Sequence, residues 1–187
     1  ANKTIARPAG YDSTLYFCST ADVPCNGVPY SFDTKKVLNY GRLPNGKYML
    51  NWPAHGNDYY LNITEADTAT RRAGYEKARQ HTLGFIYFLQ TTGGMQHLGL
   101  AGDELDKGLG WMPYIREGRR VQGLVRMKLG HIKDPYSSNL YRTGIAVGDY
   151  PVDHHHARYP GAVPEIEFPP VPAYNIPMGV LLPKGTE

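Results

Sequence analysis

The chain has 187 residues, a length that suits one domain with a substantial core. Apolar residues make up 41% and charged residues 20%, a balance that excludes a disordered chain and predicts a globular one. The net charge of +3 comes without a lysine-rich block or a basic helix, so we expect no nucleic-acid partner, and no apolar run is long enough to predict a membrane span.

The 15 tyrosines, 15 prolines and 21 glycines predict short strands, many turns and long ordered loops. The first strand candidate covers residues 14–18, which are rich in β-forming side chains. Cys18 and Cys25 follow within one turn of each other, and a disulfide there would need an oxidising compartment. Spacing alone does not establish that bond, and we expect two free thiols, without a metal site.

The turn Pro44-Asn45-Gly46 predicts a hairpin over residues 42–50. The hairpin leads into a loop that is dense in side chains able to contact a ligand: Trp52, His55, Asn57, Asp58 and Tyr59. A base, an amide and a carboxylate beside an indole suit hydrogen bonding to a polyol over an aromatic platform. The alternative is a polar loop closed by Asn and Asp side-chain turns.

One long helix is predicted over residues 64–90, with Thr64 as its cap and Asp67 completing a capping box. Gly74 and Gly84 should weaken it locally, and we expect His81 to be a hydrogen-bonded structural residue.

Gly108-Leu109-Gly110 begins like a dinucleotide-binding fingerprint. Pro113 stands where the third glycine belongs, and the pattern predicts no strand before it and no long helix after it. The match therefore does not predict a dinucleotide-binding site.

Trp111 opens an unusual segment in which three arginines and a carboxylate follow a Trp-Met-Pro-Tyr run. Arg116, Arg119 and Arg120 can stack on aromatic neighbours and also fork onto an anion, such as a cofactor phosphate. The alternative is that Glu117 pairs with one arginine and the others cover a sheet edge.

Strands are predicted over residues 121–129, 141–147 and 173–182. The fold class is therefore α+β, with a mostly antiparallel sheet and one long helix packed across it, and residues 1–187 forming a single domain. Antiparallel pairing of the first two strands would bring residues 116–120 close to residues 153–155.

Asp153-His154-His155-His156 is a second polar cluster. A His-x-His pair on a strand can hold zinc, but no third ligand stands at a helpful spacing, so we assign no metal. The other interpretations are a catalytic or substrate-contacting histidine and a solvated turn.

Three segments resemble FAD-dependent oxidoreductases, in particular a bacterial, Bacteroidetes-type group sometimes labelled xanthan lyase-like. The most specific is Tyr114-Ile-Arg-Glu-Gly-Arg-Arg-Val-Gln-Gly123, which is similar to a Tyr-Ile-Arg-Glu-x-Arg-Arg-x-x-Gly signature of that group. Residues 144–155 and 174–184 resemble two further segments, and residues 51–58 look similar as well.

The resemblance implies a flavoenzyme with a Rossmann-like FAD domain and a substrate domain built on an antiparallel sheet. The N-terminal Gly-x-Gly-x-x-Gly of such enzymes is absent here, so we expect this chain to be the substrate-side domain and not to bind FAD alone. Its partners would be the FAD domain of the same protein and a small polar substrate, with sugars as candidates. The compartment stays open, with a bacterial periplasm or the outside of the cell among the candidates.

By the same resemblance, the catalytic residues would be Arg116, Arg119 and a histidine base, either His154 or His155. Arg116 and Arg120 would contact the cofactor. Asp153 and Trp111 would contact the substrate, together with the residues of the 52–59 loop. The competing interpretation is a carbohydrate-binding module or a polysaccharide lyase that uses the tryptophans and tyrosines as sugar platforms.

Overall fold

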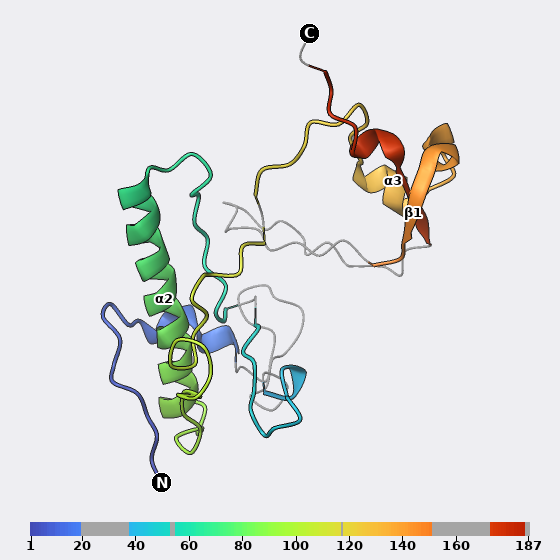
Figure 1. Cartoon of the computed structure of the whole chain (residues 1–187). Coiled ribbons are helices and arrows are strands. Elements are labelled where there is room, and N and C mark those ends of the chain that lie inside the picture. The colour runs from blue at the N-terminus through green and yellow to red at the C-terminus, as the bar shows by residue number, and fades with distance from the viewer. Residues whose placement is uncertain (20–37, 53–54, 117, 151–172, 186–187) are drawn as a thin grey trace. The chain divides into compact units, whose positions relative to one another are not determined.

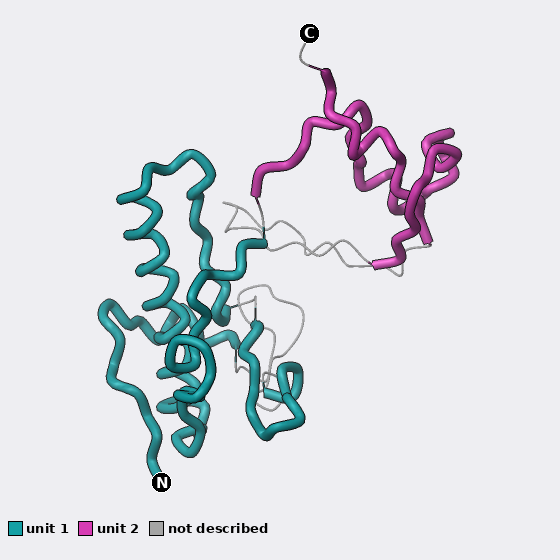
Figure 2. The backbone as a smooth tube through the Cα atoms, viewed as in Figure 1, with its two compact units in different colours: residues 1–116, 155–162 teal, residues 117–154, 163–187 magenta. Residues whose placement is uncertain are grey.

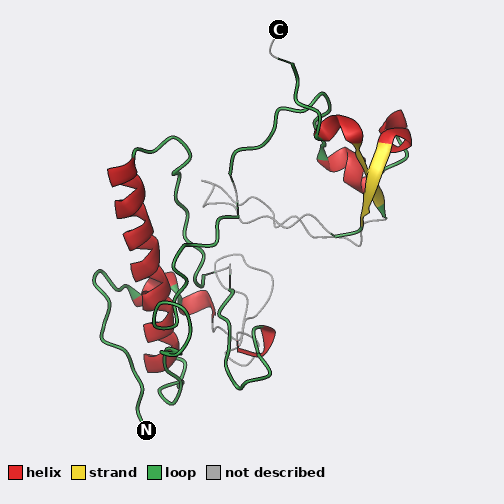
Figure 3. Cartoon of the chain, in the orientation of Figure 1, coloured by secondary structure: helices red, strands yellow, loops and turns green. Residues whose placement is uncertain are grey.

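The computed structural model describes residues 1–19, 38–52, 55–116, 118–150 and 173–185. The fold is α+β, as predicted: it contains one long helix, α2 (Thr68–Thr91), and a two-stranded antiparallel sheet (Figure 3). The backbone divides into two compact units (Figure 2): unit 1, Ala1–Arg116 with His155–Ala162, and unit 2, Glu117–His154 with Val163–Glu187. Helix α2 belongs to unit 1 and the sheet to unit 2.

Helix α2 begins after Asp67, which has an extended backbone and accepts a hydrogen bond from the Thr70 N–H. The prediction that Thr64 caps this helix is therefore wrong. A carboxylate accepts hydrogen bonds from the free N–H groups of the first turn and is attracted to the positive end of the helix dipole. Asp67, not Thr64, is therefore the cap. The helix ends at Thr91, one residue beyond the predicted end.

The core of unit 1 lies against α2, where Phe85, Phe88 and Leu89 are buried together with Tyr16 and Met95. Gly84 lets the Tyr16 ring approach the helix, because a Cβ atom there would collide with the tyrosine hydroxyl. Gly74 likewise leaves room for the Leu61 side chain, since a Cβ atom at this position would lie only 2.6 Å from Leu61 Cδ2. The two glycines that weaken the helix in isolation are therefore its packing sites.

Residues 14–18 do not form the predicted strand. They lie in two short 3-10 helices, η1 (Ser13–Leu15) and η2 (Phe17–Ser19), with Tyr16 in the turn between them. Asp12 caps the first by accepting hydrogen bonds from the Thr14 N–H and hydroxyl, which also lower the pKa of its carboxyl. The turns let the neighbours Cys18 and Ser19 both be buried, whereas a strand would point their side chains to opposite faces. Cys18 is disulfide-bonded, so the expectation of two free thiols is wrong.

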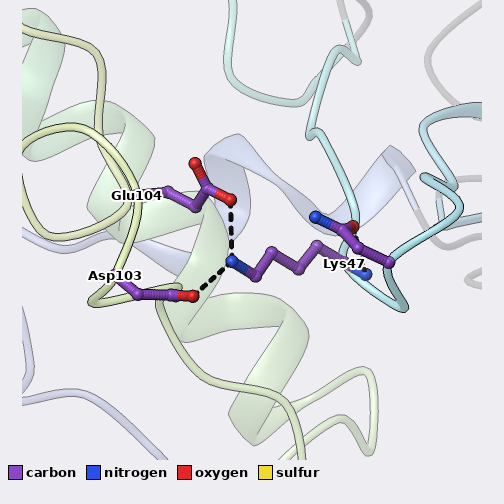
Figure 4. Close-up of polar contacts among 4 residues, drawn as sticks. Lys47, Asp103 and Glu104 are labelled. Atoms are coloured by element: carbon purple, nitrogen blue, oxygen red, sulfur yellow. Dashed lines mark hydrogen bonds and ion pairs between the residues drawn. The ribbon is translucent and has the colours of Figure 1, made fainter.

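Ion pairs join the 103–106 segment to the hairpin turn and to helix α2 within unit 1. The predicted turn is present, with Arg42 bridged to Tyr48 and Gly46 at a positive φ of 74°. From this turn the Lys47 ammonium contacts Asp103 at 2.6 Å and Glu104 at 2.7 Å (Figure 4). These hydrogen bonds raise the pKa of Lys47 and lower that of Asp103. Arg79 on α2 holds Asp106 at 3.0 Å.

Unit 2 contains α3 (Leu129–Lys133), η3 (Asn139–Thr143), β1 (Gly144–Gly148), β2 (Tyr174–Pro177) and η4 (Met178–Val180) (Figure 1). Residues 121–129 are not the predicted strand. Their backbone makes irregular contacts with residues 179–184, such as the Leu124 N–H to the Leu182 carbonyl, and Leu129 already begins α3. The later strands are shorter than predicted, and β1 pairs with β2 rather than with residues 121–129.

Among the described helices, none is long and apolar enough to cross a membrane. The backbone divides into two compact units, and the prediction that residues 1–187 form a single domain stays a prediction.

Gln90 is a buried polar side chain that joins three segments of unit 1. Its amide N–H groups donate to the carbonyls of Lys3 and Leu98, and its oxygen accepts from the Ile5 N–H. Gln90→Leu would leave these partly buried groups without their partners, so we expect the free energy of unfolding to fall by roughly 2–5 kcal/mol in urea denaturation. Gln80→Leu, on the same helix, is the matched control and should change stability by about 0.5 kcal/mol or less, because among the described residues the Gln80 side chain bonds to Glu76 alone. Equal effects of the two changes would contradict this role of Gln90.

Candidate functional site

The loop after the hairpin is closed by Asn57. Its side-chain oxygen accepts from the Trp52 N–H at 2.7 Å, its amide donates to the Leu50 carbonyl, and its own N–H donates to the Trp52 carbonyl at 3.0 Å. Gly56 has no room for a Cβ atom beside Trp52, and His55 has a positive φ of 54°. This tight turn fixes the position of the side chains that flank it, notably Trp52 and Asp58.

Arg116 reaches this loop from a distant part of the sequence. Its Nη2 donates to Asn51 Oδ1, and its Nε lies 3.5 Å from Asp58 Oδ1. The guanidinium also lies over the Tyr114 ring, 5.2 Å from its centroid. The Arg116 and Asp58 side chains are about one-quarter exposed, at 24% and 27%, so the pair is accessible to a small molecule. Arg116 thus joins the loop to the Trp111–Tyr114 run.

His81 supports the same loop from helix α2. Its Nε2 lies 2.9 Å from the Gly56 carbonyl, which can only accept, so Nε2 carries the proton. Its ring packs against Tyr59, with centroids 5.3 Å apart. On the other side, the Tyr16 hydroxyl donates to the His81 carbonyl at 2.9 Å and lies 3.3 Å from Nδ1. His81 is therefore hydrogen-bonded, as predicted, and positions the loop.

Burial raises the pKa of Tyr16 to about 12, with smaller contributions from the charges of Tyr11 and Asp12. A buried phenolate would lose its hydration, and at Tyr16 it could no longer donate to the His81 carbonyl. The hydroxyl therefore stays protonated throughout the physiological range.

The structure brings some of the predicted site residues together. Trp52, His55, Asn57, Asp58 and Tyr59 lie in one loop, and Arg116 contacts it. Trp111 lies in the same unit and is 81% exposed. Arg119 and Arg120 are exposed residues of unit 2, whereas Asp153, His154 and His155 fall outside the described residues. Residues 121–129 do not pair with β1, although we expected this pairing to bring residues 116–120 close to residues 153–155. That these two groups of residues lie together therefore stays a prediction.

The stacking of Arg116 on an aromatic neighbour, here Tyr114, is as predicted. Sequence reasoning missed Asn51 as a partner of Arg116, and Tyr16 as the support of His81. No local pattern carries these contacts, since Asn51 and Arg116 are 65 residues apart, as are Tyr16 and His81. Within the described ranges, no group of three or more His, Cys, Asp or Glu side chains is arranged to hold a metal ion.

The raised pKa of Tyr16 predicts a loss of stability in alkali. The unfolded chain releases this proton near the ordinary tyrosine pKa of about 10, and the folded chain only near 12. The free energy of unfolding should therefore fall between these pH values, by roughly 2–3 kcal/mol from this group. Urea denaturation at pH 9 and pH 11 should show a smaller pH dependence in Tyr16→Phe, and an unchanged one in Tyr60→Phe, an exposed control. The same slope in Tyr16→Phe as in the wild type would contradict the assignment.

Comparison with known proteins gives one match. A family model described as FAD dependent oxidoreductase covers residues 3–187, which includes the loop, Arg116 and both units. No curated protein and no solved structure matches the chain. Because the family match extends over almost the whole sequence, this chain belongs to the family of FAD-dependent oxidoreductases.

Proposed function

We propose that this chain is the substrate-side part of an FAD-dependent oxidoreductase and that it binds a small polar substrate beside Arg116. The observation that carries the proposal is the convergence of Arg116, Asp58 and Asn51 next to the closed loop. A guanidinium, a carboxylate and an amide in one partly exposed cluster can bind several hydroxyl groups at fixed positions.

The charges of this cluster favour a neutral, hydroxyl-rich substrate. Asp58 offsets much of the positive charge of Arg116, and Asn51 occupies one of its donors. A phosphate or a strongly anionic substrate would have to compete with that carboxylate. A sugar hydroxyl can instead donate to Asp58 and accept from Arg116. The Tyr114 and Tyr59 rings add apolar faces of the kind on which sugar rings pack.

The described residues do not fit the pyrophosphate of FAD. The N-terminus of α2, the one long helix among them, is closed by the Asp67 carboxylate, whose pKa is lowered by its hydrogen bonds to Thr70. A phosphate there would face a negative charge instead of free N–H groups. Gly108 packs against its own loop, since a Cβ atom would lie 2.8 Å from the Ala101 nitrogen. We therefore propose that another part of the enzyme carries the flavin.

The remaining roles follow from the family resemblance. We propose His154 or His155 as the base that takes the substrate proton, with Asp153 beside it in contact with the substrate. Arg119 would act near the reacting atoms and Arg120 near the cofactor. His55, Asn57 and Trp52 would shape the substrate side, with Asn57 acting through the loop that its amide closes. The disulfide at Cys18 suits an oxidising compartment, such as a bacterial periplasm or the outside of the cell.

A carbohydrate-binding module is the second candidate, and two exposed rings favour it. Trp111 and Tyr114 are 81% and 84% exposed, as platforms for a polysaccharide would be. A module of this kind would bind sugars without any flavin, whereas the oxidoreductase needs both. A lyase would additionally use a tyrosine or histidine base and an arginine that neutralises a uronate.

The purified chain 1–187 should be colourless and should not retain FAD, because the described residues offer no cradle for its pyrophosphate. The test is to mix the chain with excess FAD, pass it through a desalting column and measure flavin absorbance in the protein fraction. A yellow fraction with about one flavin per chain would show that the cradle lies within these residues. The complete gene should also encode a Gly-x-Gly-x-x-Gly segment outside residues 1–187.

Substrate contact by Arg116 can be tested without flavin. Saturation-transfer NMR with a neutral monosaccharide and with its uronate should show binding of the neutral sugar by the wild type. Arg116→Ala should weaken it by about tenfold or more, because the guanidinium and the placement of Asp58 are lost together. Arg142→Ala is the matched control, since Arg142 also lies over a tyrosine ring, 5.8 Å from the Tyr141 centroid, but outside this cluster. Equal binding by both variants would contradict the site.

A further inference from the structure

A line of aromatic rings leads from the loop after the hairpin into the core of unit 1. Tyr59, which is 41% exposed, packs its ring against the His81 ring, with the ring centroids 5.3 Å apart. On the core side, the His81 ring packs against Tyr16, with the centroids 5.1 Å apart, and Tyr16 is only 2% exposed. The imidazole of His81 therefore contacts both an accessible phenol and a buried one.

The two ring nitrogens of His81 have different partners. Nε2 donates to the Gly56 carbonyl at 2.9 Å, so in the neutral ring Nδ1 carries no proton and can only accept. The Tyr16 hydroxyl lies 3.3 Å from Nδ1 and donates to the His81 carbonyl at 2.9 Å. Rotation about the C–O bond of the phenol turns its proton from the carbonyl to Nδ1. Tyr16 is therefore a buried phenol with a base within reach of its proton.

The burial of Tyr16 makes this base important. Loss of an electron alone would leave a cation in the apolar core, and loss of the proton alone would leave a phenolate, and burial opposes both charges. The pKa of Tyr16, raised to about 12, shows the second of these costs. The phenol can instead lose both and become a neutral tyrosyl radical, because a base beside the hydroxyl takes the proton.

Three further rings that pack against Tyr16 are harder to oxidise than Tyr16 itself. The Tyr11 ring is stacked on it, with the centroids 6.1 Å apart, but the Arg7 guanidinium lies over Tyr11, 5.4 Å from its centroid. Removing an electron from Tyr11 would place a second positive charge beside that cation. Phe85 and Phe88 lack a hydroxyl group altogether. A radical that reaches Tyr16 should therefore stay there.

We propose that Tyr16 and His81 form a redox-active pair that takes up one oxidising equivalent from the loop. The oxidant is an oxygen-centred radical, which removes a hydrogen atom from the accessible Tyr59 phenol. An electron then passes from Tyr16 through the His81 ring to Tyr59, which also regains a proton from solvent. The Tyr16 proton moves to His81 Nδ1. A soluble thiol later returns an electron to Tyr16, releases its own proton to solvent and becomes a thiyl radical, while His81 returns the proton to the Tyr16 oxygen.

The pair keeps oxidative damage away from the loop that carries Asp58. Radicals of this class form where O₂ takes up single electrons, which is a hazard for a member of an oxidoreductase family. At the buried Tyr16 the radical meets fewer groups with which it can react than at Tyr59. This role goes beyond the proposed function and does not depend on it, because neither Arg116 nor a substrate takes part.

The first test produces the oxidant beside Tyr59 in the full chain 1–187. A ruthenium polypyridyl complex is attached through Tyr60→Cys, since Tyr60 is exposed, and the disulfide at Cys18 is left closed. A light flash with an irreversible electron acceptor turns the complex into a one-electron oxidant, and EPR spectroscopy detects the tyrosyl radical. We expect a long-lived signal in the presence of a soluble thiol, because the thiol reaches the buried Tyr16 slowly.

Tyr16→Phe in the labelled chain keeps the ring but removes the oxidisable hydroxyl, so the radical should stay at Tyr59 and the long-lived signal should be lost. Tyr40→Phe is the matched control, since the Tyr40 ring packs against Trp52, outside this line, and it should leave the signal unchanged. A long-lived signal that survives Tyr16→Phe would overturn the proposal. So would a wild type in which the radical decays as fast as in Tyr16→Phe.

The second test removes the base. His81→Gln keeps an N–H donor for the Gly56 carbonyl, but its amide oxygen is a far weaker base than imidazole. The yield of the long-lived radical should fall by about tenfold or more. His97→Gln, an exposed histidine outside the line, should leave the yield unchanged, and urea denaturation checks that both variants are folded. An undiminished yield in folded His81→Gln would overturn the proposal, and if this variant does not fold, Tyr16→Phe decides alone.

Discussion

The approach of Tyr16 to helix α2 is the contact on which unit 1 depends. Gly84 leaves room for the phenol ring, which packs against Phe85 and Phe88, with ring centroids 5.9 Å away in each case. The hydroxyl at the far end of the ring then bonds to the His81 carbonyl, and the His81 ring in turn bonds to the Gly56 carbonyl. One side chain thus couples the apolar core to the loop that carries Asp58. Any larger residue at position 84 would displace the ring and, through it, the loop.

The long helix was predictable, but most of the short elements were not. A repeated apolar face of 24 residues carries enough signal to place α2 within a few residues, and only the competition between Thr64 and Asp67 shifted its start. Residues 14–18 and 121–129 have β-forming composition and still take other conformations. Strand formation needs a partner, and among the described residues the only regular partner for β1 is β2. The first segment instead turns, so that the neighbours Cys18 and Ser19 can both be buried.

The site was predictable as two separate pieces. A loop rich in polar and aromatic side chains and an arginine cluster each stand out in sequence, but only the three-dimensional structure shows that Arg116 reaches Asp58. It also gives Asn57 and Asp58 different tasks: the amide closes the loop, whereas the carboxylate faces the guanidinium. His81 carries no motif, because its importance comes from the carbonyl it meets on another segment. Side chains that act through such distant backbone contacts leave no local trace in a sequence.

The sequence separation of these contacts sets the order in which unit 1 can assemble. The bonds of Tyr16 to His81 and of Arg116 to Asn51 each span 65 residues, and those of Gln90 to Ile5 and Lys3 span 85 and 87. Closing loops of this length lowers the chain entropy before any favourable contact forms to offset that loss, and folding is therefore slower. Helix α2 can form locally and early, but its apolar face stays open until the first nineteen residues return to it. On the ribosome, that N-terminal segment must wait, unfolded, until the residues of α2 have been synthesised.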